Sequence, residues 1–520
     1  MAMTDGNLWS ALRAGFPAEL GRIAVETADT PVPLLYTWAD IDRGTAMLAN
    51  LLGSLALPKD ARIAVQVEKS VEALMLYLAV LRAGYVYLPL NNAYQQAELA
   101  YFIGNAEPAV VVCAGANFGW TSKLAFKAGV RHVFTLNDDR SGTLLDRAAF
   151  QSDVHVAAVK AADDMAAILY TSGTTGRSKG AMLTHGNLLS NARVLHEAWG
   201  WVNHDERRDV LIHALPIFHV HGLFVASHGA LLNGSKMIWF SRFDAAAVAA
   251  RLPEATVFMG VPTLYVRLLA ERGLTREACR SIRLFVSGSA PLLIETFEAW
   301  RTRTGHTILE RYGMSETVML TSNPYRPESA RRGGTVGKPL PGVGLRVHDD
   351  KGRPLPTGEI GQIEVKGPNV FKGYWRMPEK TADEFTNDLW FKTGDVGQMD
   401  EGGFVTIVGR SKDLIISGGY NVYPAEVEGY INALPGVAES AVVGVPHPDF
   451  GEAVLAVVVA RADAAQAPDP ARVIAALKST IANFKVPKQV FVVPELPRNA
   501  MGKVQKALLR EQHKALFARA

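Results

Sequence analysis

The chain has 520 residues, too many for one ordinary hydrophobic core, so we expect two or more domains. Lys and Arg together exceed Asp and Glu by 54 − 51 = 3, a surplus too small to indicate binding to nucleic acid or to a membrane. The two cysteines, Cys113 and Cys279, lie far apart and outside any CxxC pair, and the amino terminus lacks a signal-peptide pattern. These properties favour a globular enzyme of the cytoplasm.

From about residue 40 to residue 115, amphipathic helical stretches alternate with short apolar strands such as RIAVQV, YVYLPL and PAVVVCA. The same alternation recurs from about residue 165 to residue 310. Strands that alternate with helices predict βαβ units on parallel sheets, and therefore two sheet-containing halves. After about residue 335 the pattern changes to short strands with turns such as DDKGRP, which predicts a small β-rich subdomain.

From about residue 411, helical and strand patterns mix again, as in EVEGYINALPGV, ESAVVGVP and VLAVVVA. We place the boundary at VGRSKDLI, which divides the chain into residues 1–410 and residues 411–520. The predicted fold class is α/β, with a large amino-terminal domain made of two α/β sheet subdomains and the small β-rich subdomain. A small α+β carboxy-terminal domain follows it.

The segment YTSGTTGRSKG, residues 170–180, follows the strand pattern AAILY and carries the clearest chemical signal. Hydroxyls and glycines at this density offer many donors to phosphate oxygens, and Lys179 adds a positive charge. The spacing fits neither a Walker A loop nor a GxGxxG dinucleotide fingerprint. Taken alone, such a loop could also be a surface connection between a strand and a helix.

Six further motifs follow in order: LPIFHVHG (215–222), VSGSAPL (286–292), ERYGMSET (310–317), WFKTGDVG (390–397), VGRSKDLIISGGYNVYP (408–424) and LPRNAMGKVQK (496–506). With the loop, they resemble the core motifs of the acyl-adenylate-forming family, which includes acyl-CoA synthetases, peptide-synthetase adenylation domains and firefly-type luciferases. The resemblance extends over essentially the whole chain. It implies ATP, Mg²⁺ and coenzyme A as the small molecules that the protein uses.

The resemblance implies that a first group of residues binds ATP and then AMP. The adenine pocket would combine the Tyr312 ring with the SGSAP turn, and Glu316 with Thr171 would hold Mg²⁺, a cation that prefers oxygen ligands. Ser315 replaces the threonine common in the family but keeps the hydroxyl. Asp395 and Arg410 would hold the ribose. The predicted nucleotide-binding residues are Thr171, Ser172, Gly173, Thr174, Thr175, Gly176, Lys179, Ser289, Ala290, Pro291, Arg311, Tyr312, Gly313, Met314, Ser315, Asp395 and Arg410.

The resemblance assigns the catalytic lysine to Lys503, in MGK near the carboxy terminus, and also counts Glu316 and His219 as catalytic. A positioned ammonium group can stabilise the negative charge that develops during adenylation. Lys506 is the neighbouring alternative, and we expect it at the surface. Because acetylation removes a lysine's charge, a lysine acetyltransferase acting on Lys503 is the candidate regulatory partner.

The carboxy-terminal domain is implied to be mobile, turning between adenylation and thioester formation about Lys412. His219 is implied to gate the acyl site, whereas the residues leave a site role and a packing role equally open for His221. A glycine-rich segment, in which a thin ligand can pass close to the backbone, would line the coenzyme A tunnel. Its members are Gly418, Gly419 and Tyr420.

The segments VPTLYVRLL (261–269), RLFVSGSAPL and VKGPNVFKGYWRMPEKT resemble the malonyl-CoA synthetase branch, which implies a short dicarboxylic acid, malonate or methylmalonate, as substrate. A second carboxylate is best held by a buried arginine through two parallel charge-assisted hydrogen bonds. Arg267 lies in an otherwise apolar run, so we predict that it is the clamp, with Ser289 and His219 completing the substrate site. Arg283 is the rival, although a structural role is favoured for it.

A medium-chain or aromatic acyl-CoA synthetase would carry the same motifs and is the leading alternative. From other classes, a luciferase-like oxygenase and a non-catalytic adenylate binder remain open, although the intact loop and Lys503 disfavour the binder. No carrier or condensation module is visible, which disfavours a modular peptide synthetase.

Overall fold

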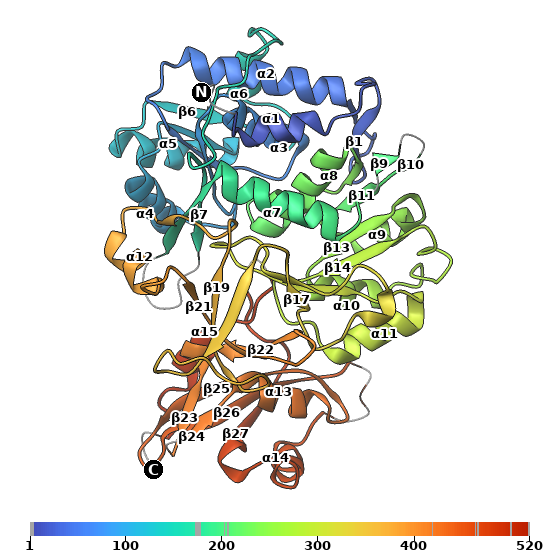
Figure 1. The fold of residues 1–520 in the computed structure, drawn as a ribbon, viewed down its shortest axis with the longest axis vertical. Helices are drawn as coiled ribbons and strands as arrows, with labels where there is room; N and C mark the ends of the chain where they lie inside the picture. The colour runs from blue at the N-terminus through green and yellow to red at the C-terminus, as the bar shows by residue number, and fades with distance from the viewer. Residues whose placement is uncertain are drawn as a thin grey trace. The chain divides into compact units, whose positions relative to one another are not determined.

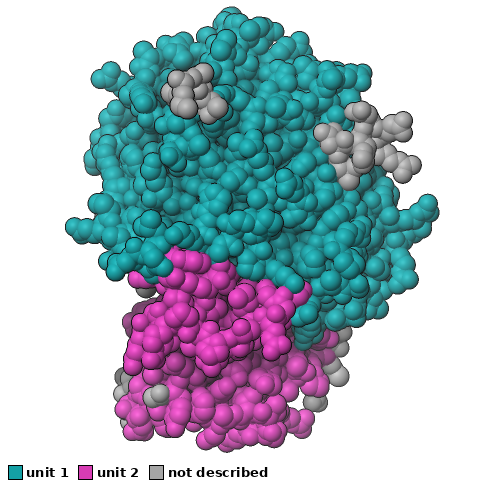
Figure 2. All heavy atoms as spheres, in the orientation of Figure 1, with its two compact units in different colours: residues 1–344, 366–389 teal, residues 345–365, 390–520 magenta. Residues whose placement is uncertain are grey.

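The computed structural model describes residues 5–171, 178–201, 203–204, 207–418, 420–462, 464, 467–499 and 502–517. Internal contacts divide the chain into two compact units (Figure 2). Unit 1 comprises residues 1–344 and 366–389, and unit 2 comprises residues 345–365 and 390–520. The strands just before residue 410 therefore group with the carboxy-terminal part, and the boundary that the sequence places at residue 410 stays a prediction.

The first sheet of unit 1, of which β6 and β7 are labelled in Figure 1, has the strand order β20-β8-β7-β4-β3-β5-β6. Neighbouring strands from β7 to β6 run parallel, as the βαβ pattern predicts, whereas β8 and β20 are antiparallel additions. The strands are β3 (Arg62–Gln66), β4 (Val86–Pro89), β5 (Val110–Cys113), β6 (His132–Thr135), β7 (Met165–Thr171), β8 (Lys179–Thr184) and β20 (Gly373–Tyr374).

Helix α3 (Val71–Arg82) is buried at every position. Its sequence VEALMLYLAVLR offers no polar face, and such a helix is stable only when its whole surface is covered. The Ser70 side chain starts the helix by accepting a hydrogen bond from the Ala73 amide. The other helices of the first 200 residues are α1 (Leu8–Ala14), α2 (Trp38–Ser54), α4 (Gln96–Ala106), α5 (Phe118–Lys127), α6 (Thr143–Ala148) and α7 (His185–Ala198).

The second sheet of unit 1 has the order β17-β16-β15-β14-β13-β11-β12-β1-β2. Strands β15 to β1 form its parallel centre, and the antiparallel strand β2 closes the edge beside β1. The sequence analysis did not assign β1 and β2, which come from the amino terminus. The strands are β1 (Ile23–Thr27), β2 (Leu35–Thr37), β11 (Val210–His213), β12 (Lys236–Trp239), β13 (Val257–Gly260), β14 (Leu284–Ser287), β15 (Leu309–Tyr312), β16 (Thr321–Ser322) and β17 (Lys338–Pro339).

The remaining elements of unit 1 include a π-helical turn at residues 221–227, which carries His221. A short hairpin of β9 (Asn203–His204) and β10 (Arg207–Arg208) precedes β11. The helices are α8 (His228–Asn233), α9 (Ala245–Arg251), α10 (Pro262–Ala270), α11 (Ile294–Thr304) and α12 (Pro378–Glu384).

Unit 2 contains two sheets, one with the order β18-β19-β21-β22 and one with β24-β23-β26-β25, where β27 adds in parallel to β26. They confirm the β-rich subdomain and the α+β region, and with unit 1 they confirm the predicted fold class. The elements are β18 (Gly344–His348), β19 (Gly361–Lys366), β21 (Phe391–Met399), β22 (Val405–Arg410), β23 (Ile415–Ser417), β24 (Tyr420–Val422), α13 (Pro424–Asn432), β25 (Val437–His447), β26 (Gly451–Ala460), α14 (Pro470–Lys478), β27 (Gln489–Val493) and α15 (Lys506–His513).

Both cysteines are buried. Burial raises the pKa of the Cys113 thiol to about 11 and that of Cys279 to about 12, so both stay protonated and unreactive at neutral pH. Across the described ranges, no helix has the length and apolar character needed to cross a bilayer.

Candidate active site

The predicted phosphate loop joins two strands of a hairpin. Thr171 ends β7, Lys179 begins β8, and the two residues are register partners. The alternative of a connection between a strand and a helix is therefore wrong, because KGAMLT forms strand β8 before helix α7 begins. The predictions for Ser172, Gly173, Thr174, Thr175 and Gly176 lie outside the described residues and stay predictions.

Lys179 contacts two other side chains of unit 1, Glu384 and Tyr374. Its Nζ is 3.2 Å from Glu384 Oε1 and 4.2 Å from the centre of the Tyr374 ring. The Tyr374 hydroxyl donates a hydrogen bond of 3.0 Å to Oε1 of the buried Glu316. One tyrosine therefore connects the loop lysine with the predicted Mg²⁺ ligand. Tyr374 lies in VKGPNVFKGYWRMPEKT and Glu384 follows it, but the sequence analysis gave neither residue a role.

The SGSAP turn follows β14 and has an unusual backbone. Ser289 has φ +72°, a left-handed conformation that is uncommon outside glycine. Gly288 faces the side chain of Arg311, and a Cβ added at Gly288 would lie 2.5 Å from the guanidinium carbon. Glycine is therefore required there for the turn to close over the arginine. Ala290 is half-buried and Pro291 is exposed in this turn.

Tyr312, Gly313, Met314 and Ser315 continue from β15 and are all half-buried, so side chains of this segment can meet a ligand. A Cβ on Gly313 would lie 1.8 Å from the Val318 carbonyl oxygen, so only glycine fits. The structure thus brings the predicted adenine segments to the carboxyl ends of the neighbouring strands β14 and β15. This edge is where parallel sheets bind ligands.

Arg311 is buried, and its Nε and Nη2 atoms have no hydrogen-bond partner among the described residues. Burial lowers the pKa of its guanidinium to about 9, although Tyr265 and Glu310 oppose this shift. Burial, followed by the charge of Arg311, lowers the pKa of His221 well below its usual value, so this imidazole is neutral. A buried arginine with open donors is the arrangement that an anionic ligand would complete. The sequence analysis assigned Arg311 only to the nucleotide.

The two histidines of LPIFHVHG lie beside this arginine. His221 is buried, and its Nδ1 is 3.4 Å from Ser289 Oγ. The His221 amide donates to His219 Nδ1 at 3.5 Å, and His219 is half-buried. His221 therefore contacts Ser289, a predicted substrate residue, which favours a role in the site over a packing role.

Arg267 differs from the prediction that it is buried. It is exposed on α10, and its guanidinium makes no ion pair or hydrogen bond within the part of the chain that the structure describes. The buried face of this helix consists of Leu264, Tyr265 and Leu268, which leaves residue 267 on the opposite side. Its role as a clamp stays a prediction.

Arg283, the rival, forms a buried ion pair with Asp209, with Nε 2.7 Å from Oδ1 and Nη2 2.7 Å from Oδ2. Its Nη1 donates to the Trp199 carbonyl oxygen at 2.8 Å. These contacts satisfy the guanidinium and support the structural role that the sequence analysis favoured for Arg283.

Glu310 precedes Arg311 and is also buried. Burial raises the pKa of its carboxyl to about 8, although the Leu292 amide and Arg311 oppose this shift. The folded chain then keeps a proton that the unfolded chain loses above about pH 4.3, so stability falls as pH rises toward 8.

We expect Glu310→Gln, which is neutral at every pH, to be more stable than the parent at pH 8 by on the order of 2–4 kcal/mol and by much less at pH 5. Melting temperatures at pH 5, 6.5 and 8 measure this, with Glu379→Gln on exposed α12 as the control. A gap between the two proteins that stays constant with pH would contradict the assignment.

In unit 2, Asp395 and Arg410 are register partners on β21 and β22. Arg410 Nε lies 2.6 Å from Asp395 Oδ1, and the Asp395 side chain is almost fully covered. The two residues predicted to hold the ribose are therefore held next to each other.

Lys503 closes a tight turn that fixes its backbone. The Lys503 amide donates to Asn499 Oδ1 at 3.0 Å, and its carbonyl oxygen accepts from the Asn499 amide at 2.9 Å. Desolvation, followed by the charge of Arg410, lowers the pKa of Lys503, although Asp395 and Asp413 oppose this shift and the residue is exposed by surface area. Lys506, the alternative, is engaged by Glu428 at 2.6 Å.

The predicted coenzyme A segment lies at the β23–β24 turn. Gly418 has φ +59°, a conformation that favours glycine. Tyr420 is 59% exposed, and its ring stacks on Phe484 with centres 4.6 Å apart. Gly419 lies outside the described residues.

Two family models match the chain. The model of the AMP-binding enzyme covers residues 24–375, and that of the AMP-binding enzyme C-terminal domain covers residues 426–503. The chain belongs to the AMP-binding enzyme family. This membership confirms the family predicted from the motifs, and the predicted boundary at residue 410 falls between the two matched regions.

Its similarity to individual relatives extends over most of the chain. An ATP-bound structure of MatB from Rhodopseudomonas palustris is 51% identical with a TM-score of 0.94, over 99% of this chain and 100% of that one. A malonate–CoA ligase of Arabidopsis thaliana is 36% identical over 87% of this chain and 78% of its own length. The mitochondrial malonate–CoA ligase of Homo sapiens is 35% identical over 83% of this chain and 79% of its own length.

The Mg²⁺ that this AMP-binding enzyme is implied to use fits the residues present. Magnesium usually binds through one or two carboxylates, substrate phosphates and water. Glu316 supplies one buried carboxylate that is oriented by the Tyr374 hydroxyl. The hydroxyl of Thr171, the second predicted ligand, donates to the Lys179 carbonyl oxygen at 3.4 Å. Within the described part of the chain, no group of three or more His, Cys, Asp or Glu residues forms a self-sufficient metal site.

The predicted hinge residue of this AMP-binding enzyme, Lys412, lies in a short 3₁₀ turn at residues 411–413. Burial, followed by the charge of Arg410, lowers the pKa of Lys412 to about 8.

Lys412→Pro should spare adenylate formation and slow thioester formation by about tenfold or more, because proline fixes φ. The two half-reactions are measured by pyrophosphate exchange and by thioester yield from supplied acyl-AMP. Lys412→Ala, which removes the side chain and its charge but leaves φ free, is the control. Equal damage to both steps in Lys412→Pro would exclude the hinge role.

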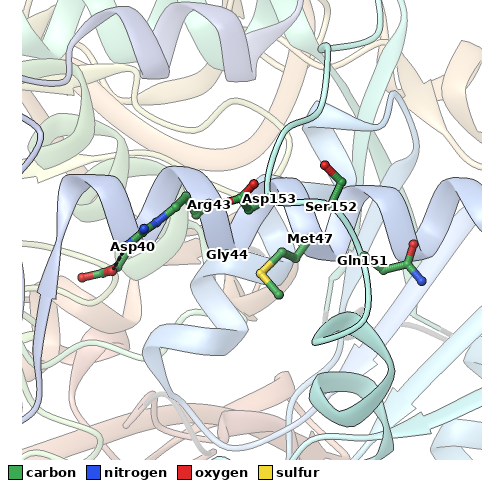
Figure 3. A pocket seen from close by; sticks show the side chains of 7 residues that line it. All are labelled: Asp40, Arg43, Gly44, Met47, Gln151, Ser152 and Asp153. Atoms are coloured by element: carbon green, nitrogen blue, oxygen red, sulfur yellow. Dashed lines mark hydrogen bonds and ion pairs between the residues drawn. The ribbon is translucent and has the colours of Figure 1, made fainter.

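A surface hollow of about 570 Å³ lies over α2 (Figure 3). It contains none of the predicted site residues. Its lining residues are Asp40, Arg43, Gly44, Met47, Gln151, Ser152 and Asp153.

Proposed function

We propose that this AMP-binding enzyme is an acid–thiol ligase that converts malonate, ATP and coenzyme A to malonyl-CoA, AMP and pyrophosphate. The observation that carries the choice of acid is Arg311, a buried guanidinium beside His221 with two nitrogen atoms that lack a hydrogen-bond partner among the described residues. His221 in turn contacts Ser289. A short dicarboxylate would supply the counter-charge that this arginine lacks. Relatives named as malonate–CoA ligases support the same substrate.

The reaction has two steps. In the first, one malonate carboxylate oxygen attacks the α-phosphorus of ATP, and the bond to the departing pyrophosphate breaks. In the second, the coenzyme A thiolate attacks the acyl carbon, and AMP leaves with its bonding electrons. Both steps develop negative charge on oxygen, which positioned cations stabilise.

We assign Lys503 to the first step, where its ammonium stabilises charge at the reacting carboxylate and α-phosphate. Lys179 binds phosphate oxygens, and Glu316 with Thr171 would hold Mg²⁺, which neutralises phosphate charge when bound. Asp395 and Arg410 bind the ribose. The neutral His221, together with Ser289 and His219, borders the acyl group.

The proposed substrate site contains two arginines with different exposure. Arg311 is fixed and buried, whereas Arg267 is exposed and able to move onto an incoming carboxylate. We propose that Arg311 provides the fixed charge and that Arg267 remains the candidate clamp. A medium-chain or aromatic acid would leave the Arg311 donors unpaired, which disfavours this alternative.

Steady-state kcat/KM for malonate, methylmalonate, acetate and octanoate, with AMP release as the readout, tests the proposal. We expect malonate or methylmalonate to be used best. If octanoate were the best substrate, the dicarboxylate assignment would fail, and the absence of turnover with every acid would remove the ligase itself.

Two finer proposals accompany this function. Acetylation of Lys503 would remove its charge and stop the first step, so a lysine acetyltransferase is the proposed regulatory partner. We propose the cytoplasm as the location, on composition, whereas the human relative is named as mitochondrial.

A further inference from the structure

Glu384, the last residue of α12, forms ion pairs with two lysines through one carboxylate oxygen. Its Oε1 lies 3.2 Å from Lys179 Nζ and 3.2 Å from Lys380 Nζ. The Lys179 and Glu384 side chains are each 22% exposed, so water screens their ion pair only in part. Among the described residues, Glu384 is the one acid within ion-pair distance of Lys179.

The helix that presents Glu384 is anchored without help from Lys179. Thr381 Oγ1 accepts a hydrogen bond of 2.9 Å from the Tyr374 amide, and the Thr381 amide donates to the Met377 carbonyl oxygen. Gly373 has φ +138°, and a Cβ added there would lie 2.7 Å from Thr381. The α12 helix therefore packs directly on β20 through contacts that do not involve Lys179.

A bound triphosphate and the Glu384 carboxylate compete for the ammonium group of Lys179. The ammonium group loses the carboxylate when it moves onto a phosphate, and a phosphate that approaches the pair is repelled by the carboxylate. Lys380 remains beside Glu384 after such an exchange, so the carboxylate is not left without a counter-charge. The exchange can therefore run in both directions at low cost.

We propose that Glu384 competes with phosphate for Lys179, weakens the binding of ATP and of pyrophosphate, and thereby speeds the release of pyrophosphate after the first step. The inference rests on the proposed function, because it requires Lys179 to bind phosphate. It assigns to Glu384 a positioning role on the phosphate site.

Glu384→Gln removes the competing charge and keeps the shape of the side chain. We expect two constants to fall about fivefold, the change expected for one partly exposed ion pair. They are the inhibition constant of pyrophosphate, measured kinetically, and the dissociation constant of ATP, measured by calorimetry without malonate. Glu379→Gln is the matched control, since it removes the same charge from the exposed surface of the same helix. Both constants should stay within about twofold in the control.

Experiments in the Lys179→Met variant separate this inference from the proposed function. Lys179→Met alone should weaken ATP binding, and if it does not, the phosphate role of Lys179 fails. In Lys179→Met, a further Glu384→Gln change should alter each constant by less than about twofold, because only the direct repulsion between the carboxylate and phosphate remains. The inference is overturned if Glu384→Gln leaves both constants unchanged or raises them, or if the fivefold fall persists without Lys179.

Discussion

Lys503→Ala should lower the rate of adenylate formation by about 10²–10³, the usual loss when a positioned charge-stabilising group is removed. The ammonium group acts on charge that develops at the carboxylate and the α-phosphate, so kcat should fall more than KM rises. Malonate-dependent exchange of labelled pyrophosphate into ATP measures this step. Thioester formation from supplied malonyl-AMP should stay within about threefold of the parent, because Lys503 takes no part in the second step.

The neighbouring lysine supplies the control for this experiment. Lys506→Ala removes the same charge three positions away, but its ammonium is bound by Glu428 and has no assigned role in catalysis. Its exchange rate should therefore remain close to that of the parent. If Lys503→Ala damaged both half-reactions equally with its melting temperature unchanged, the assignment would be wrong.

Arg311→Met should destroy the preference for dicarboxylic acids. Breaking a buried charge pair costs on the order of 2–5 kcal/mol, which corresponds to roughly 30- to 4000-fold in kcat/KM for malonate. Butyrate has no second carboxylate, so its kcat/KM should change little or rise. Methionine keeps much of the bulk, and replacing a buried unpaired charge by an apolar side chain does not require loss of stability. The ratio of kcat/KM for malonate over butyrate is the measurement.

Arg267→Met is the companion variant, because it removes the same charge from an exposed position. Arg267→Met should lower the ratio of kcat/KM for malonate over butyrate only if bound malonate covers the Arg267 guanidinium. A ratio unchanged within about threefold in Arg311→Met would exclude Arg311 from the substrate site. The second carboxylate would then be assigned to Arg267 alone.

The regular parts of the fold could be predicted because their sequence periods are plain. Strands such as RIAVQV and helices such as VEALMLYLAVLR alternate without interruption, and they form the parallel sheets as expected. The antiparallel strand β8 was missed because KGAMLT lies directly between a glycine-rich loop and the cap of α7. Strand pairing of this kind is decided by a neighbour in space, which a local pattern does not show.

The candidate site could be predicted as a set of residues but not as a set of contacts. The motifs identify Glu316 and Lys179, yet neither sequence distance nor residue type shows that Tyr374 lies between them. Arg267 was expected to be buried because its run is apolar. Val266 beside it is nevertheless 52% exposed, so the apolar letters of this helix do not all face the core.

The position of β1 in the second sheet has a consequence for the order of biosynthesis. Val25 of β1 pairs with Met237 of β12, so β1 waits for its second partner until about 200 further residues have been made. At the usual rate of translation this interval lasts roughly 10 to 40 seconds. During it β1 can pair only with β2, and the other side of β1 stays an open edge, the kind of segment that chaperones must shield. The hairpin of β1 and β2 thus joins the second sheet only after β12 has been made.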